Sequence, residues 1–171
     1  VSPIVRLSDS NEKNILHALE VGANNILASH VTSPIEAEKI VRSTRYYPDG
    51  ERGISLFTRN HGYSDKNFKI KMKDLNSQIF TGVLVEGEKG IDNLEKICDT
   101  ENLDMVYLGI YDISQVLGVP GDVKNNKVIK LINDLVKMIE SKGLVAGSVA
   151  PDKEYLKLLI DSGFRFISYR A

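Results

Sequence analysis

The sequence has little of several residue types and patterns that mark particular classes of protein. It contains one cysteine, Cys98, and no tryptophan, so an internal disulfide framework and a cysteine-rich zinc site are excluded. The 22 basic and 23 acidic residues leave a formal net charge of -1, without the basic excess of a nucleic-acid-binding or membrane-surface protein. No apolar run approaches the roughly 20 residues of a membrane span, and no signal peptide is recognised. These absences predict a cytoplasmic protein without nucleic-acid or membrane partners.

The chain has the length and composition of one globular domain. Its 171 residues are 42% hydrophobic and 26% charged, which is enough for a single core and too little for two. It begins with Val1 rather than Met, and we therefore expect a segment upstream of Val1.

Short apolar runs alternate with segments of helical periodicity along the whole chain. The longest amphipathic helix is expected at Val128–Ile139, where apolar residues recur three and four positions apart. Thr32 or Ser33 is expected to cap a helix that has Pro34 in its first turn. The other predicted helical segments are 15–21, Asn67–Ser77, Ile91–Ile97, Ile113–Leu117 and Tyr155–Ile160, and the predicted strands are 4–7, 25–30, Phe80–Val85, Met105–Leu108, Leu144–Val149 and 164–168.

The predicted strands are continuous apolar runs, which is typical of a parallel sheet covered by helices. Such a sheet is either open and doubly wound or closed as a (β/α) barrel. No G-x-G-x-x-G pattern or P-loop follows any predicted strand, so the usual reason to favour a nucleotide-binding open sheet is missing. A complete barrel takes about 250 residues and eight units, and about six units are recognised here. The sequence therefore predicts an incomplete barrel.

Two carboxylates follow neighbouring predicted strands. Glu86 comes after Gly82–Val85, and Asp112 comes shortly after Met105–Leu108. Ligands of parallel sheets bind at the carboxyl ends of the strands, and two acids facing one pocket repel each other unless a cation lies between them. Oxygen ligands of this kind suit Mg²⁺ or Mn²⁺. The alternative is that each acid only stabilises the start of the next helix.

Three further polar residues have open interpretations. Arg52 lies between glycines in the segment 48–53, where it either grips a carboxylate with two hydrogen bonds or is a solvated surface residue. His30 is either a pocket residue or a histidine packed under the next loop. The segment 59–63 is expected to be a flexible loop, in which His61 is a weak candidate for substrate contact.

Several segments in the same order resemble the HpcH/HpaI aldolase family, metal-dependent pyruvate aldolases that act on 2-oxo-3-deoxy acids. The most specific are the turn 44–53 with its Arg-Gly pair and the two carboxylate strands, 85–94 and 107–122. The start of the chain (3–6 and 18–23) and its end (163–168) also match. The resemblance covers nearly the whole chain.

The resemblance implies a (β/α)₈ TIM barrel, of which residues 1–171 would be a single partial domain with strands 3 to 8, lacking the first two strands and the last helix. It implies Glu86 and Asp112 as ligands of a divalent metal, Mg²⁺ or Mn²⁺ with Co²⁺ as a further option. Arg52 would contact the carboxylate or enolate, and the backbone of Gly109, Ile110 and Tyr111 would lie against the substrate carboxylate. A 2-oxo acid and an aldehyde would be the substrates, and the protein would form a homo-oligomer.

The sequence also departs from the family pattern. Leu84, Ile110 and Tyr111 replace residues usual in close relatives, Ser29 replaces a proline, and the family's histidine base belongs to the part expected upstream. Three hypotheses therefore remain: a pyruvate-type aldolase or lyase, a diverged subunit of the same fold that binds metal or 2-oxo acid or serves assembly without catalysis, and an unrelated open α/β binding domain.

Overall fold

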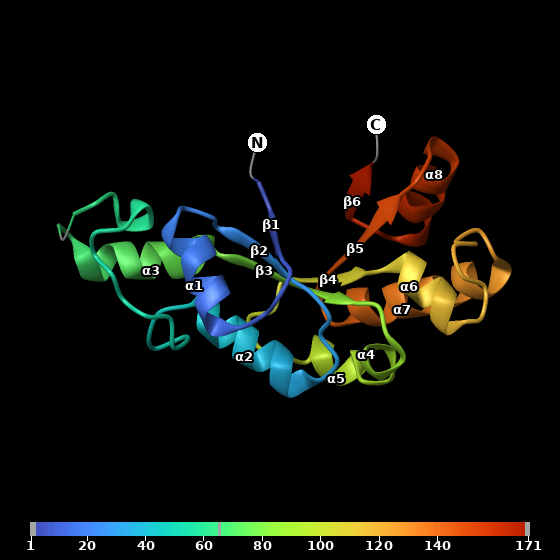
Figure 1. The fold of residues 1–171 in the computed structure, drawn as a ribbon, viewed down its shortest axis with the longest axis horizontal. Helices are drawn as coiled ribbons and strands as arrows, with labels where there is room; N and C mark the ends of the chain where they lie inside the picture. The colour runs from blue at the N-terminus through green and yellow to red at the C-terminus, as the bar shows by residue number, and fades with distance from the viewer. Residues whose placement is uncertain (1–2, 65, 170–171) are drawn as a thin grey trace.

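The computed structural model describes residues 3–64 and 66–169 as one curled sheet with helices packed around it (Figure 1). The strands and the helices alternate along most of the chain, as predicted. In order they are β1 (Val5–Leu7), α1 (Glu12–Glu20), β2 (Asn25–Ala28), α2 (Pro34–Thr44), the 3₁₀ turn η1 (Arg59–His61), α3 (Phe68–Gln78), β3 (Phe80–Val85), α4 (Glu88–Asp92), α5 (Leu94–Cys98), β4 (Met105–Leu108), α6 (Ile110–Val116), α7 (Asn126–Ser141), β5 (Val145–Ala150), α8 (Lys153–Ser162) and β6 (Phe166–Tyr169).

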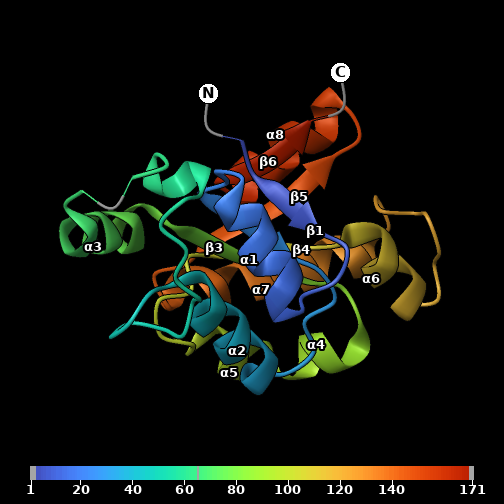
Figure 2. The ribbon, with the colours of Figure 1, turned by 60° about the vertical axis from the view of Figure 1, so that its left-hand side comes forward.

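All neighbouring strands are parallel, and their order in the sheet is their order in the chain, from β1 to β6. The sheet curls, so that β1 and β6 rise on the same side of it (Figures 1 and 2). A parallel sheet of this order and curvature is part of a TIM-type barrel, and the prediction of an incomplete barrel is confirmed.

The two faces of the sheet are packed differently. The main core lies between the strands and the helices and includes fully buried residues such as Ile26, Val83, Val106 and Ile132. The concave face carries a small cluster made only of residues on or beside the strands, centred on Leu27, Leu84 and Met105. Apolar residues on both faces explain why the strands read as continuous apolar runs.

Local capping sets where the helices begin. The Ser33 side chain accepts from the backbone N–H of Glu36 and so caps α2, with Pro34 as its first residue. Asn11 caps α1 and Asp152 caps α8 in the same way. Of the two predicted caps of α2, Ser33 is therefore the one used.

Several predicted segments begin or end at other residues in the structure, and three of the differences are informative. The strand expected at 25–30 ends at Ala28, since His30 adopts a positive φ of 57°, which β structure does not allow. The helix expected at Ile91–Ile97 is divided at Asn93 into α4 and α5, and the Asn93 side chain donates to the carbonyl of Thr32. The segment 59–63 contains η1 rather than only a flexible loop.

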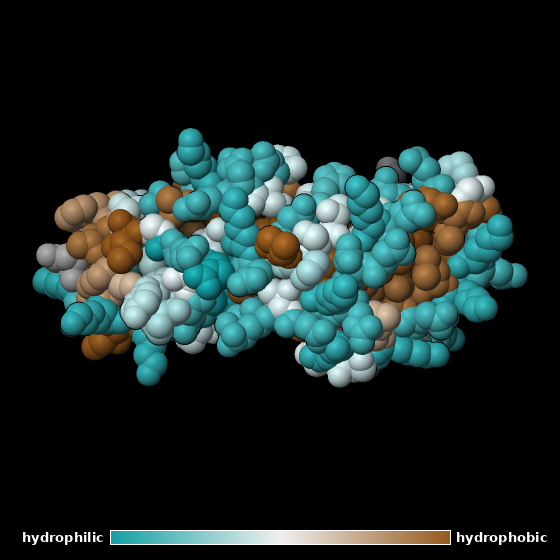
Figure 3. Space-filling view, turned by 90° about the horizontal axis from the view of Figure 1, so that it is seen from below, coloured by the Kyte–Doolittle hydropathy of each residue, from teal (hydrophilic) through white to brown (hydrophobic). Residues whose placement is uncertain are grey.

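Apolar surface gathers at both ends of the face shown in Figure 3, one of which is formed by α3 and the segment that precedes it. We call the end at α3 the apolar end; its exposed residues are Tyr47, Ile54, Phe57, Tyr63 and Ile70. Among the helices of the described residues, none has both the length and the apolar character needed to cross a membrane.

Candidate active site at the carboxyl edge of the sheet

The parallel register brings the residues that follow β3 and β4 together at one edge. Val85 lies opposite Leu108, so Glu86 and Gly109 are neighbours just beyond the strands. Leu7 lies opposite Ala28, which places Ser29 beside the end of β1. We call this the carboxyl edge.

Glu86 is the most perturbed charged group at this edge. It is 8% exposed, and its pKa is raised, chiefly by burial and also by the nearby Asp112, while His30 and Arg6 act in the opposite direction. Nδ1 of His30 lies 2.5 Å from Oε1 of Glu86, within ion-pairing distance, and among the described residues this buried oxygen has no hydrogen-bond partner. A buried acid of this kind, next to a second acid, favours a bound cation.

Gly109 allows the close approach of the Glu86 side chain. A Cβ added at Gly109 would lie 2.6 Å from both Cβ and Oε2 of Glu86, which is closer than real side chains approach. The glycine is also the N-cap residue of α6. The absence of a side chain at position 109 thus lets the carboxylate and the start of a helix share one small space.

The three residues after Gly109 are placed very differently. Ile110 is fully buried in the main core, so its side chain is not available to a substrate and only its backbone could take the predicted role. Tyr111 is 47% exposed. Asp112 lies in the first turn of α6, exposed and near enough to Glu86 to raise its pKa.

Arg6 is a residue of this site that the sequence analysis missed. Its Nε donates a hydrogen bond of 3.1 Å to Oγ of Ser29, and its positive charge lowers the pKa of Glu86. Arg6 lies opposite Leu27, a residue of the concave-face cluster. A charged residue inside an otherwise apolar strand was the signal that could have identified it.

Arg52 lies at the other edge of the sheet. Its backbone N–H donates to the carbonyl of Arg45 just after α2, and Arg45 in turn contacts Thr81 and Asp104 at the starts of β3 and β4. The Arg52 guanidinium stacks 4.4 Å from the ring centre of Tyr46. The loop that follows α2 brings Arg52 to the amino ends of the strands. Within a single chain, Arg52 therefore does not reach a substrate bound by Glu86 and Asp112, and the predicted contact is not formed.

The two uncertain histidines are now distinguished. His30 lies at the carboxyl edge in contact with Glu86, as the pocket interpretation proposed. His61 is 1% exposed and its Nε2 lies 2.9 Å from the Tyr46 hydroxyl. Burial and the charges of Arg52 and Lys71 lower the pKa of His61. This histidine is part of the packing at the edge where the strands begin, which we call the amino edge.

The donor groups at the carboxyl edge fit a divalent metal, for which the protein supplies only part of the ligand shell. In the region that the structure describes, no three His, Cys, Asp or Glu side chains are grouped so that they could hold a metal ion. Two carboxylates are nevertheless the number by which Mg²⁺ is often bound, with water or substrate oxygens completing the shell. The buried Oε1 without a hydrogen-bond partner supplies one such ligand.

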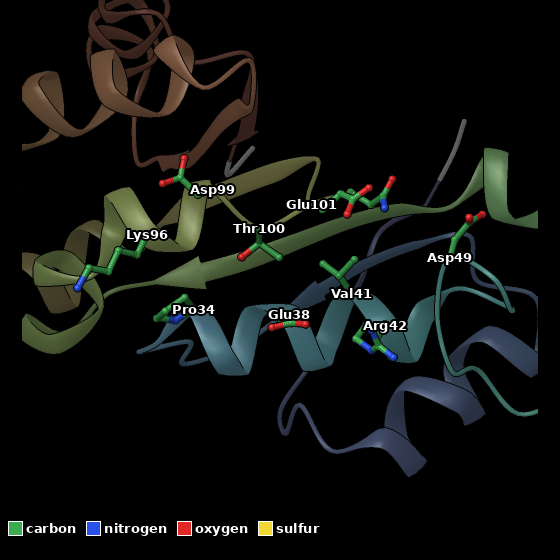
Figure 4. A pocket seen from close by; sticks show the side chains of 10 residues that line it. Pro34, Glu38, Val41, Arg42, Asp49, Lys96, Asp99, Thr100 and Glu101 are labelled. Atoms are coloured by element: carbon green, nitrogen blue, oxygen red, sulfur yellow. The ribbon is translucent and has the colours of Figure 1, made fainter.

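A cavity of about 500 Å³ lies beside the ends of β1 and β2 and is lined by Ser8, Ser29 and His30 among others. A second cavity, of about 300 Å³, lies between α2 and the residues from α5 onward (Figure 4). Two of its charged residues are already paired, Arg42 with Glu51 and Asp99 with Lys142. Neither cavity is lined by Glu86 or Asp112, and the first is connected to them only through His30, which contacts Glu86.

The chain belongs to the HpcH/HpaI aldolase/citrate lyase family, whose family model matches residues 1–169. It is 32% identical over 173 residues to a hydroxypyruvate/pyruvate aldolase of Paraburkholderia phytofirmans, with 99% of this chain and 66% of that protein covered. It is 31% identical over 152 residues to a 2-keto-3-deoxy-L-rhamnonate aldolase of Escherichia coli, covering 88% of this chain and 57% of the relative. The chain thus spans less than two thirds of the length of these relatives.

One solved structure agrees with this assignment, and a second shows the same fold. A HpcH/HpaI aldolase/citrate lyase family protein from Burkholderia cenocepacia superimposes with a TM-score of 0.91 at 26% identity, covering 99% of this chain and 67% of that chain. A more distant structure of the same fold, CitE of Mycobacterium tuberculosis in complex with magnesium and pyruvate, has a TM-score of 0.61 at 12% identity, covering 98% of this chain and 62% of that chain.

Proposed function

We propose that this chain provides the metal-binding and enolate-stabilising part of an aldolase that joins or separates a pyruvate-type 2-oxo acid and an aldehyde. The observation that carries the proposal is the buried carboxylate of Glu86, with a raised pKa and the second acid Asp112 beside it. The aldolase relatives and the magnesium and pyruvate in the CitE structure support it.

In this proposal Glu86 and Asp112 hold a divalent ion, Mg²⁺ or Mn²⁺. A bound ion of this kind polarises the carbonyl of a 2-oxo acid and so lowers the free energy of its enolate. The oxygen donors do not discriminate strongly among hard divalent ions, and Co²⁺ is also a candidate.

Arg6 takes the part that the sequence analysis gave to Arg52. Its guanidinium is close enough to the carboxyl-edge acids to lower the pKa of Glu86, and it would stabilise the negative charge that develops on the substrate oxygen. The backbone of Gly109–Tyr111 would lie against the substrate carboxylate, because α6 begins there and the first N–H groups of a helix have no partner within it.

The proposal is tested by titrating Mn²⁺, and then oxalate as a mimic of the pyruvate enolate, into the complete protein. Glu86→Gln and Asp112→Asn are expected to weaken Mn²⁺ binding by at least tenfold, roughly the loss of one charge-assisted contact. Glu88→Gln is the matched control, because Glu88 lies two residues away and is exposed. Mn²⁺-dependent oxalate binding that survives both site variants would contradict the proposal.

A different outcome would favour the non-catalytic hypothesis. Wild-type protein that binds Mn²⁺ but neither oxalate nor pyruvate would indicate a pocket closed by residues such as Leu84 or the half-exposed Tyr111. The family fold would then serve binding or assembly.

We also propose that the protein is a homo-oligomer with small-molecule substrates. The apolar end presents Tyr47 and Phe57 at 82% and 73% exposure, and contiguous apolar patches on soluble proteins mark contact surfaces. Light scattering after gel filtration tests this, and a monomer at micromolar concentration would contradict it.

A further inference from the structure

We propose that Ser29 is a positioning residue that aims the Arg6 guanidinium at the substrate. This inference rests on the proposed function. Ser29 is 5% exposed and lies one residue beyond β2, beside the end of β1. Among the described residues it forms no hydrogen bond to Glu86 or Asp112, and in the proposal it acts through Arg6.

The hydrogen bonds of Ser29 have a fixed direction. Its hydroxyl donates to the carbonyl of Leu7 over 2.6 Å and accepts from Nε of Arg6 over 3.1 Å. A serine hydroxyl has one hydrogen. Because that hydrogen is committed to Leu7, a lone pair of Oγ must face Arg6, and the serine can hold the arginine only as an acceptor.

The arginine nitrogen that binds Ser29 determines which nitrogens of Arg6 remain available to a substrate. The bond to Ser29 occupies Nε, the inner nitrogen of the guanidinium, and within residues 3–64 and 66–169 neither Nη1 nor Nη2 of Arg6 forms a hydrogen bond to the protein. The outer pair of nitrogens is the end of the fork that binds two oxygens at once. Ser29 therefore leaves Arg6 ready for an end-on contact with a carboxylate or enolate.

The backbone of Ser29 is itself held in place. Its carbonyl accepts a hydrogen bond of 3.1 Å from the Ser10 hydroxyl, in the segment between β1 and α1. Ser29 thus connects the ends of both strands to the segment that follows β1. An arginine on an exposed strand has many rotamers, and a buried acceptor at Nε reduces the conformational entropy that it would lose on binding substrate.

The structure offers a matched control. Ser148, in the second half of β5, is buried like Ser29, and its hydroxyl donates to the carbonyl of Leu108 over 2.9 Å. It has the same strand-to-strand hydrogen bond as Ser29 and no arginine. Comparing Ser29→Ala with Ser148→Ala separates the loss of a buried hydroxyl from the loss of the Arg6 contact.

The experiment measures oxalate binding to the Mn²⁺-loaded complete protein in Ser29→Ala, Ser29→Thr, Ser148→Ala, Arg6→Met and the double variant Arg6→Met/Ser29→Ala. We expect Ser29→Ala to weaken oxalate binding about tenfold, as for the loss of a hydrogen bond that orients a charged group, with Mn²⁺ affinity unchanged. Ser29→Thr restores the hydroxyl and should restore binding. The double variant should bind no more weakly than Arg6→Met.

Additive losses in the double variant, or an equal loss in Ser148→Ala, would overturn the proposal. If wild-type protein binds Mn²⁺ but no oxalate, the proposed function fails instead. The hydrogen bond between Arg6 and Ser29 is then tested by NMR. The Nε–H of Arg6 should exchange with solvent faster in Ser29→Ala than in wild type or Ser148→Ala. Equal exchange rates would overturn the inference independently of any activity.

Discussion

The amino and carboxyl edges of the sheet both carry charged residues, but these residues are paired differently at the two edges. At the amino edge Arg45 is buried and donates to Thr44, Thr81 and Asp104. At the carboxyl edge Arg6 and Asp112 are exposed, and a buried oxygen of Glu86 contacts His30 but has no hydrogen-bond partner among the described residues. Charge that is fully paired by the protein stabilises the fold, whereas charge left incompletely paired is available to a ligand. This division matches the general separation of stability and activity in barrels.

Arg52 is an exception among the charged residues of the amino edge. Arg52 is 5% exposed, and within residues 3–64 and 66–169 none of its three guanidinium nitrogens has a hydrogen-bond partner. Burial lowers its pKa, while Tyr46 and Glu20 act in the opposite direction. Arg52 thus has the buried position of Arg45 without the hydrogen bonds.

The largest expected effect comes from filling the space at Gly109. Gly109→Ala should destabilise the protein by about 3 kcal/mol, as expected for overpacking a tight contact, because the new Cβ meets the Glu86 side chain at 2.6 Å. It should also weaken Mn²⁺ binding. Denaturant unfolding and Mn²⁺ titration measure the two effects.

Gly87→Ala is the control for this substitution. Gly87 has a φ of -104° and no heavy atom within 4 Å of an added Cβ, so alanine fits there. If both variants unfold at the same denaturant concentration, Gly109 is not the tight contact that the structure shows.

Removing the paired arginine of the amino edge should have the next largest effect. Arg45→Met leaves Thr81 and Asp104 without their shared partner, and we expect a loss of about 2 kcal/mol, reduced from that of a fully buried pair because Asp104 is 32% exposed. Arg42→Met, which removes an exposed ion pair with Glu51, should cost clearly less stability than Arg45→Met. Equal losses in urea unfolding would contradict the comparison.

The amino edge should also respond to pH through His61. Its pKa is lowered in the folded state, so the unfolded chain binds more protons once the pH falls below the ordinary histidine value of about 6.5. The free energy of unfolding should therefore decrease as the pH falls through this range. His61→Gln should reduce that slope, measured by urea unfolding between about pH 7 and 5. An unchanged slope would contradict the assignment.

The smallest effect is expected for the arginine without hydrogen bonds. Arg52→Met should change the free energy of unfolding by less than about 1 kcal/mol in either direction, because the lost stacking on Tyr46 is offset by removing a buried charge. A loss as large as that of Arg45→Met would show that Arg52 is paired in solution, with Glu20 as the nearby acid.

Much of the fold could be predicted from periodicity, because strands covered on both faces and amphipathic helices leave strong patterns. The break at Asn93 could not, since it depends on a hydrogen bond to Thr32, which is distant in sequence. The early end of β2 depends on the backbone of His30, whose positive φ no pattern indicates.

For the candidate site, topology was the useful guide. Glu86 and Asp112 could be paired because parallel strands end at one edge, and the structure brings them together. Arg6 escaped notice because β1 has only three residues and gives little pattern to interpret. Arg52 was placed with the acids because the family resemblance implied that contact, and the glycines that flank it do not tell to which edge a long segment returns.

The order of the strands has a consequence for synthesis on the ribosome. Because each strand pairs with the strand made just before it, a newly emerged unit can dock without waiting for any later part of the chain. Contacts close in sequence form quickly, and translation at roughly 5–20 residues per second leaves time for each step. The sheet can therefore grow in one direction as the nascent chain lengthens, with the carboxyl edge assembled one residue at a time, from Arg6 through Ser29 and Glu86 to Gly109.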